Sequence, residues 1–328
     1  MKAVYITEFG SADAVEFRAV PDPPQPQDEQ VLVRVRAAGL NRADLLQVGG
    51  HYPPPVGYSP NGPGLEFAGE VATVGNKVTM WKTGDRVFGI TAGEAQAELL
   101  LTHETLLSPI PNRLNFVKAA AVPEAFITAH DALFTLGELK EHETLLIHAV
   151  GSGVGLAALQ LAKAKGATVI GTSRTVDKLE ACKEFGLDQG IATGEDIGFS
   201  RAVKELSDEH GADVILDLVG AAYFAENLAS LAFNGRLVLV GLTSGSKAEF
   251  DLGIALKKRA RIIGTVLRTR SVEEKADAIR KFDEPVLPLL QTGAIKPNID
   301  HIFAAAEAVE AYKYLASNKS FGKIVLEF

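Results

Sequence analysis

A glycine-rich run, His148-Ala-Val-Gly-Ser-Gly-Val-Gly155, stands between a short apolar segment and a longer one rich in alanine and leucine. Glycines at such a turn let backbone N–H groups approach a pyrophosphate, and the start of the following helix adds partial positive charge. Counted back from Gly155, the pattern G-x-G-x-x-G has Val150 and Ser152 at its first and third positions, so the match is incomplete. The run alone fits either a dinucleotide-binding turn, formed by Gly151, Ser152, Gly153, Val154 and Gly155, or an ordinary tight strand-to-helix connection.

The end of the next predicted strand bears on the choice of nucleotide. NAD-binding turns usually have Asp or Glu about 20 residues further on, where the carboxylate bonds the ribose 2′-hydroxyl. Here the run Gly171-Thr-Ser173 leads to Arg174 and then to Lys178, and its end carries no acid. Two cations suit a 2′-phosphate, so we expect NADPH, with NADH a weaker alternative, and assign Ser173, Arg174 and Lys178 to the nucleotide site. The other interpretation makes both cations solvated surface groups.

Two more glycines follow predicted strands, Gly220 and Gly241. Ligands of open α/β sheets bind at the carboxyl ends of the strands, so both glycines would let a cofactor lie close to the backbone. Each fits equally well as a plain turn that ends its strand.

The elements around the glycine-rich run alternate between strand and helix. Short apolar strands are predicted about 20 to 30 residues apart with helices between them, which indicates a parallel sheet covered on both faces. The strands are 145–148, 167–172, 214–218 and 236–240, and the helices are 154–165, 176–185 and 225–231.

The first 120 or so residues have another character. Strands are predicted at 31–35, 67–74 and 86–90, and Gly, Pro and Asn separate them, as in a barrel or sandwich. A helical stretch is predicted over 119–136, interrupted at Pro123, and helices at 272–282 and 304–316 precede a last strand at 322–327. We therefore expect a β-rich domain over 1–122, an inserted α/β domain over 123–264, and a tail over 265–328 that returns to the first domain.

Composition narrows the class of protein. The chain has 328 residues, 47% of them hydrophobic and 23% charged, and a formal net charge of −8, which disfavours a nucleic-acid binder. Its one cysteine, Cys182, excludes an internal disulfide and a zinc site built on several thiolates. The N-terminus has no signal-peptide pattern, and no apolar run is long enough to span a membrane. We expect a cytoplasmic protein without membrane insertion.

Several further motifs run from one end of the chain to the other: Gly39-Leu-Asn-Arg-Ala-Asp-Leu-Leu-Gln47, Gly64-Leu-Glu-Phe-Ala-Gly-Glu70, Gly84-Asp-Arg-Val87, Pro123-Glu-Ala-Phe-Ile-Thr-Ala129, Ser152-Gly-Val-Gly155 and Gly322-Lys-Ile-Val-Leu326. Together they resemble the medium-chain dehydrogenase/reductase superfamily, and more narrowly its zinc-free NADPH:quinone oxidoreductases. The serine of the glycine turn and Leu267-Arg-Thr-Arg270 are most similar to the tumour-suppressor-induced quinone oxidoreductase subgroup. The resemblance implies a Rossmann doubly wound sheet inserted into a β-rich GroES-like domain.

The zinc members of this superfamily have a cysteine and a Gly-His-Glu motif in the first domain. The corresponding run here is Gly64-Leu65-Glu66, and no cysteine precedes Cys182. A catalytic zinc needs about three protein ligands, and the seven histidines show no pair at ligand spacing beside a carboxylate. We therefore expect no bound metal.

The resemblance implies that first-domain loops carrying Asn41, Asp44 and Tyr52 lie near the nicotinamide. Asn41 would hydrogen-bond a substrate carbonyl or the ribose, and Tyr52 would donate a hydrogen bond or a proton to a developing oxyanion. Asp44 fits better as a helix cap, and Tyr52 fits equally well as an aromatic residue wedged in the loop Pro53–Pro55.

The resemblance also implies further cofactor contacts along the chain. Thr128 would lie near the nicotinamide, although a threonine inside a helix often bonds its own backbone. NADPH-specific relatives often have a tyrosine near the 2′-phosphate, and Gly190-Ile-Ala-Thr-Gly194 has none. The remaining contacts implied are Leu242, Thr243, Leu267, Arg268, Phe321 and Lys323.

Together these observations predict an NADPH-dependent reductase of small-molecule quinones or other α,β-unsaturated carbonyls, which the resemblance implies is a homodimer. One alternative is an enoyl-thioester reductase acting on coenzyme A or carrier-protein substrates, for which the basic run Lys257-Lys-Arg-Ala-Arg261 would line the entrance. Another is an NADPH-binding sensor or structural protein with little turnover.

Overall fold

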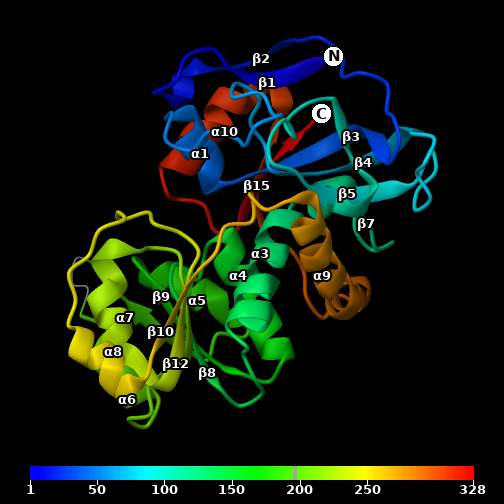
Figure 1. Cartoon of the computed structure of the whole chain (residues 1–328). Helices are drawn as coiled ribbons and strands as arrows, with labels where there is room; N and C mark the ends of the chain where they lie inside the picture. The colour runs from blue at the N-terminus through cyan, green and yellow to red at the C-terminus, as the bar shows by residue number, and fades with distance from the viewer. Residues whose placement is uncertain (195–197) are drawn as a thin grey trace. The chain divides into compact units, whose positions relative to one another are not determined.

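The computed structural model describes residues 1–194 and 198–328. The chain forms two compact units: unit 1 comprises Met1–Ile127 and Leu267–Phe328, and unit 2 comprises Thr128–Val266 (Figure 1). Within these described ranges, no helix is both long and apolar enough to cross a membrane.

Unit 1 is built on a seven-stranded sheet and a separate antiparallel pair. The sheet has the order β14-β15-β3-β4-β5-β7, with β6 also paired to β3, and every pair except β14–β15 is antiparallel. The pair β1–β2 lies outside it. The strands are β1 (Lys2–Ile6), β2 (Val15–Ala19), β3 (Gln30–Leu40), β4 (Glu66–Val74), β5 (Arg86–Ile90), β6 (Leu99–His103), β7 (Leu107–Pro109), β14 (Ile299–Ala304) and β15 (Lys323–Glu327).

Strand β3 organises this unit because its apolar side chains serve two cores. Val31, Val33 and Val35 pack with Phe67 and other residues of the sheet, while Leu40 joins a second cluster beneath the last helix. The alternation of apolar and charged residues in this segment follows from the pleat, which sends neighbouring side chains to opposite faces. The helices of the unit are α1 (Arg42–Val48), α2 (Phe116–Ala120), α9 (Val272–Thr292) and α10 (Ala308–Ala316).

Unit 2 holds a six-stranded sheet in the order β10-β9-β8-β11-β12-β13, and all its pairs are parallel. In sequence terms this is the order 3-2-1-4-5-6 of a Rossmann sheet, which reverses direction beside its first strand. The predicted α/β fold class is confirmed. The strands are β8 (Thr144–Ile147), β9 (Thr168–Ser173), β10 (Gln189–Ala192), β11 (Ala212–Asp217), β12 (Leu231–Leu239) and β13 (Arg261–Gly264).

Helices cover both faces of this sheet, since its central strands are apolar on both sides. Leu146, Ile170, Ile215 and Leu237 face one core together with side chains of α6, α7 and α8, and Figure 1 shows α4 on the other side of the sheet. The helices are α3 (Thr128–His130), α4 (Gly153–Ala164), α5 (Val176–Cys182), α6 (Ser200–Leu206), α7 (Phe224–Ser230) and α8 (Leu252–Lys258).

Two helical predictions were wrong in detail. The stretch 119–136 is a series of short pieces with π-helical turns at Pro123–Ile127 and Asp131–Leu136, because Pro123 has no N–H to continue α2. Helix α9 continues past Phe282 to Thr292 through Pro285 and Pro288. Burial of the stripe Ala278, Ile279, Phe282, Val286 and Leu290 offsets the backbone hydrogen bonds that the prolines remove.

Candidate active site

A buried ion pair joins the last strand of unit 1 to β4. The Lys323 ammonium lies 2.5 Å from Glu66 Oε1, and the two side chains are 6% and 0% exposed. The ammonium also donates to Leu40 O and to Asn41 Oδ1, each at 2.7 Å, and Asn41 Nδ2 donates to Glu66 Oε1 at 2.9 Å. The pair is therefore embedded in hydrogen bonds, as a buried charge requires.

The sequence makes room for Glu66 by placing a glycine opposite it on β3. A Cβ at Gly39 would lie 2.2 Å from Glu66 Oε1 and 2.9 Å from Ala120 O. No side chain fits there, which accounts for the glycine just before Leu40 and Asn41 in the loop that starts α1.

Asp44 is fully buried and holds two backbone segments together. Its Oδ2 accepts the Asn41 N–H at 2.7 Å, which caps α1, and its Oδ1 accepts the Gly64 N–H at 3.1 Å. Burial raises the pKa of Asp44 to about 6, against the lowering effects of the Asn41 N–H and the Lys323 charge. This geometry is that of a positioning carboxylate with both oxygens occupied.

Arg268 is also buried, and its hydrogen bonds connect the loops beside Tyr52. Its guanidinium donates to Ala92 O and Tyr52 O at 2.8 Å and to Gln47 Oε1 at 2.5 Å. It also lies over the Tyr52 ring, 4.9 Å from the centroid, in cation–π geometry. The Tyr52 hydroxyl itself has no partner among the described residues, so it is available to donate to a ligand.

Two charged residues that sequence reasoning did not assign belong to this cluster. Glu124 donates its backbone N–H to Glu66 Oε2 at 2.8 Å, and the residue is partly exposed. Lys275, on α9, is 4% exposed, and the charge of Glu124 raises its pKa against the lowering effect of burial. The motif Pro123-Glu-Ala contained Glu124, but only the fold shows that it joins Glu66.

In unit 2, the glycine-rich run forms the turn from β8 into α4. Ser152 is the N-cap of α4, and its Oγ accepts the Gly155 N–H at 3.1 Å. A Cβ at Gly155 would lie 2.5 Å from Ala149 O, so the turn requires glycine there. The N–H groups of Gly153 and Val154 have no acceptor in the described part of the chain. They are partly exposed at the switch point of the sheet, which fits a pyrophosphate.

A buried network beneath this turn was not predicted. His148 Nε2 lies 2.6 Å from Asn227 Oδ1, while Asn227 Nδ2 donates to Asp217 Oδ2 at 3.0 Å, which makes Nε2 the protonated nitrogen. Its Nδ1 lies 2.9 Å from Thr172 Oγ1. Burial lowers the pKa of His148 to about 4, so the imidazole is neutral and ties β8 to β9 and α7.

Most of the remaining predicted nucleotide contacts of unit 2 follow the carboxyl ends of its strands, while Lys178 and Thr128 lie on helices. Ser173 ends β9 and is buried, Arg174 is exposed directly after it, and Lys178 is partly exposed on α5. Gly220 and Gly241 follow β11 and β12, and their N–H groups donate to Asp217. Leu242 and Thr243 are exposed in the loop after β12, and Thr128 begins α3.

The other predicted contacts lie in unit 1. Leu267 and Lys323 are buried, and Phe321 is partly exposed. Their role toward a cofactor, and that of Arg268, stays a prediction.

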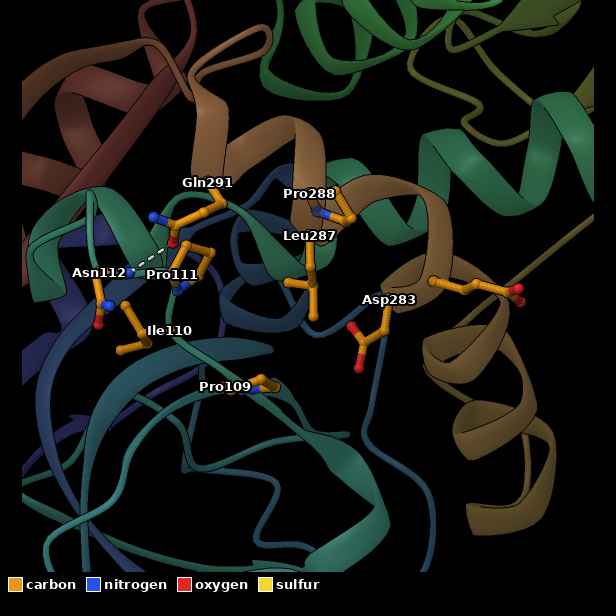
Figure 2. Close-up of a pocket in the computed structure, with 9 residues that line it drawn as sticks. Pro109, Ile110, Pro111, Asn112, Asp283, Leu287, Pro288 and Gln291 are labelled. Carbon is orange, nitrogen blue, oxygen red and sulfur yellow. Dashed lines mark hydrogen bonds between the residues drawn. The ribbon is translucent and has the colours of Figure 1, made fainter.

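A separate hollow of about 460 Å³ lies between the segment after β7 and helix α9 (Figure 2). Asp283 faces it and accepts from Ser108 Oγ at 2.7 Å, while Gln291 accepts from the Asn112 N–H at 3.0 Å. None of the residues predicted for catalysis or nucleotide binding lines this hollow.

Comparison with known proteins identifies the class. Residues 27–127 match the family model "Alcohol dehydrogenase GroES-like domain", and residues 153–284 match "Zinc-binding dehydrogenase". The chain is 34% identical to a Pseudomonas aeruginosa quinone oxidoreductase over 330 residues, covering 99% of both.

Solved structures agree with this match. A Pseudomonas syringae pv. tomato quinone oxidoreductase has a TM-score of 0.90 at 30% identity, covering 100% of this chain and 99% of that one. A mycobacterial protein solved with NADPH has a TM-score of 0.87 at 30% identity, covering 100% of both chains. The CurK enoyl reductase has a TM-score of 0.88 at 25% identity, covering 99% of this chain and 98% of that one.

The fold and these matches define a member of the medium-chain dehydrogenase/reductase superfamily, an NAD(P)H-dependent oxidoreductase. Within the superfamily, the chain belongs to the quinone oxidoreductase family. The resemblance to this superfamily and to its quinone oxidoreductases is confirmed.

Zinc, which the second family description names, does not fit the donor set of this chain. Both Glu66 oxygens are engaged by Lys323, Asn41 and Glu124, and Leu65 stands where the zinc motif has histidine. Cys182 is fully buried in α5, and burial raises its pKa to about 12. Over residues 1–194 and 198–328, no group of three or more His, Cys, Asp or Glu is arranged to hold a metal ion.

Replacing Lys323 by methionine tests the weight of the ion pair. Lys323→Met leaves Glu66 buried without its counter-charge, which costs about 3–5 kcal/mol in comparable pairs. We expect a loss of that size in the free energy of unfolding, measured by urea denaturation. The exposed Lys319→Met is the matched control, and equal stability of the two variants would contradict the central role of the pair.

Proposed function

We propose that the protein reduces quinones or other α,β-unsaturated carbonyls with NADPH and without a metal. The observation that carries the nucleotide site is the turn at Gly151–Gly155: within the described structure its Gly153 and Val154 N–H groups have no acceptor, and they lie at the switch point of the parallel sheet. The substrate class rests on the similarity to quinone oxidoreductases at 34% and 30% identity. Bound NADPH would supply a hydride from C4 of its nicotinamide ring.

The residues of unit 2 would hold the nucleotide. The first turn of α4 offers its N–H groups to the pyrophosphate, and its dipole favours negative charge there. Arg174 is exposed directly after β9, where a 2′-phosphate is expected, and Lys178 follows on α5. Ser173 ends the strand without offering a carboxylate to a 2′-hydroxyl.

The residues of unit 1 divide into those that position and those that meet the substrate. Asn41 and Asp44 already use both ends of their side chains within the network, so we assign them to positioning. Arg268 contacts the Tyr52 ring and donates to its carbonyl, and the Tyr52 hydroxyl has no partner in the described structure. We assign it the hydrogen bond to the developing oxyanion.

The enoyl-thioester alternative is supported by the likeness to the CurK enoyl reductase. Three residues of the basic run that it would require are engaged elsewhere. Lys258 donates to Ala229 O at 2.7 Å and to Leu231 O at 2.5 Å, Arg261 pairs with Glu138 at 3.0 Å, and Arg259 lies over the Phe233 ring. These contacts reduce what the run can offer to a coenzyme A phosphate.

A substrate comparison tests the proposed function. Steady-state rates with NADPH are measured for a naphthoquinone, a simple enone and crotonyl-CoA. We expect turnover of the first two with kcat/KM at or above that for the thioester. A preference of tenfold or more for crotonyl-CoA would establish the enoyl-thioester alternative instead, and binding of NADPH with no turnover would favour the sensor alternative.

The choice of nucleotide is tested at Arg174. Loss of a charged hydrogen bond to a 2′-phosphate costs about 1.5–3 kcal/mol, so Arg174→Ala is expected to raise KM for NADPH roughly tenfold or more. KM for NADH should change little, because NADH lacks the phosphate. Arg201→Ala, which removes an exposed arginine on α6, is the control. Equal effects on both nucleotides would contradict the assignment.

We also propose a homodimer formed through β13, the edge strand of the unit 2 sheet. An edge strand leaves backbone groups open to pairing. Ile262 within β13 is 42% exposed, and Val266 just after it is 47% exposed. Two copies related by a two-fold axis would continue the sheet.

Light scattering after gel filtration tests this assembly. We expect the mass of two chains for the unmodified protein and of one chain for Ile262→Asp. Met80→Asp, at a position in unit 1 that is 56% exposed, is the control and should stay dimeric. A monomeric unmodified protein would refute the proposal.

A further inference from the structure

We propose that the Glu124 carboxyl donates the proton that completes the reduction, and that Lys275 stabilises the carboxylate left behind. This inference rests on the proposed function and names the acid for the same site.

The backbone places the Glu124 carboxyl at the edge of the buried network. Its N–H is fixed on Glu66 Oε2 at 2.8 Å, at the start of the π-helical turn that follows α2. Glu124 as a residue is partly exposed, and its carboxyl has no hydrogen-bond partner in the described ranges. A side chain that is held at its backbone and whose acidic end is not engaged by the protein has the geometry of a general acid.

Charges on every element around Glu124 set its protonation state. Burial raises its pKa to about 8, and the neighbouring Glu66 carboxylate adds to the rise. Asp44 on α1 acts in the same direction, while Lys323 and Arg268 act against it. Packed β5 carries Arg86, which donates to Leu114 O instead. The carboxyl is therefore mainly protonated at neutral pH. The titratable groups facing it are Glu66, Asp44, Tyr52, Lys323, Arg268 and Lys275.

Lys275 supplies an independent observation. It is 4% exposed on α9, and its ammonium has no hydrogen-bond partner among the residues that the structure describes. Burial lowers its pKa, and the charge of Glu124 is the largest effect in the other direction. A charged side chain that is largely covered by protein is costly without an anion beside it, and ionisation of Glu124 would supply that anion.

Glu124 is a better proton source than Tyr52. Burial raises the pKa of Tyr52 above the ordinary value of a phenol, with Arg268 opposing, so its hydroxyl holds its proton near neutral pH. A general acid works best when its pKa lies near the working pH. We therefore separate the two roles: Tyr52 donates a hydrogen bond, and Glu124 gives up a proton.

Bound NADPH would supply the hydride to the β-carbon or ring carbon of the substrate. The electron pair of the substrate C=C bond would then form the new C=C bond next to the carbonyl carbon, and the C=O π pair would move onto the carbonyl oxygen. That oxygen forms an O–H bond as the O–H bond of Glu124 breaks. Solvent then returns one proton to the Glu124 carboxylate, so NADPH is oxidised, the substrate is reduced, and one proton is consumed.

The test compares Glu124→Gln, which has no acidic proton, with Glu94→Gln. Glu94 is another partly buried glutamate of unit 1, whose pKa burial also raises. Removal of a general acid typically lowers rates about 10²- to 10⁴-fold. For Glu124→Gln we expect at least about a 100-fold loss of kcat with an enone and a smaller loss with a quinone, because hydride addition to a quinone leaves a less basic oxygen. NADPH affinity, measured by fluorescence titration, should not change, and Glu94→Gln should resemble the unmodified enzyme.

The pH dependence of kcat distinguishes a proton donor from a residue that only supports the structure, because loss of a purely structural residue would leave its alkaline limb in place. Because Glu124 must be protonated, kcat with the enone should fall above about pH 8 in the unmodified enzyme, and this limb should be absent in Glu124→Gln. Lys275→Met removes a cation that favours the carboxylate, so it should shift the limb to higher pH.

Three results would overturn the proposal: an unchanged alkaline limb in Glu124→Gln, equal losses with enone and quinone, or an unmoved limb in Lys275→Met. The last holds even when Glu124→Gln fails to fold. An unmodified protein that turns over neither substrate would refute the proposed function itself, a result distinct from these three.

Discussion

The ion pair between Lys323 and Glu66 is the contact on which unit 1 depends. Burying both charges is unfavourable unless each is paired and hydrogen-bonded, and here Asn41, the Leu40 carbonyl and the Glu124 N–H complete the bonding. Because Lys323 begins the last strand, the pair fixes the end of the chain to β4 and to the loop that starts α1. The charges of the same network also shift the pKa of the neighbouring Glu124 carboxyl.

In unit 2, buried polar side chains satisfy one another's hydrogen bonds near the glycine-rich turn. Its parallel sheet reverses direction beside β8, and the strand ends there need partners for their polar atoms. His148, Asn227 and Asp217 satisfy one another below the surface, and the amides of Gly153 and Val154 face outward above them. The imidazole is neutral, so it stabilises the base of the turn through hydrogen bonds, and the backbone amides are left to bind a phosphate.

The sequence allowed most of the α/β unit to be predicted, because buried parallel strands appear as apolar runs and glycine turns interrupt them at regular intervals. It located α4 to within a residue and β5 without error. Helix α9 exceeded its prediction because tertiary burial outweighs the local effect of Pro285 and Pro288. Strand β13 escaped notice, since a short edge strand with exposed side chains has no strong pattern.

The candidate site was less predictable, for a physical reason. Asn41, Asp44 and Tyr52 could be named from their motifs, yet the motifs do not show that the first two are saturated with hydrogen bonds. Glu124 and Lys275 lie 151 positions apart (275 − 124), and only the fold brings their charges within reach of each other. The spacing of two residues along the sequence does not show whether they lie close together in the fold.

The burial of Cys182 has a consequence for a protein of this kind. Quinones and enones are electrophiles that alkylate thiolates, and they would inactivate an enzyme that exposed one. This chain has a single sulfhydryl, which is fully covered within α5 and has a pKa of about 12. Its folded surface thus offers no thiolate, which makes the molecule chemically tolerant of the reactive compounds it is proposed to handle.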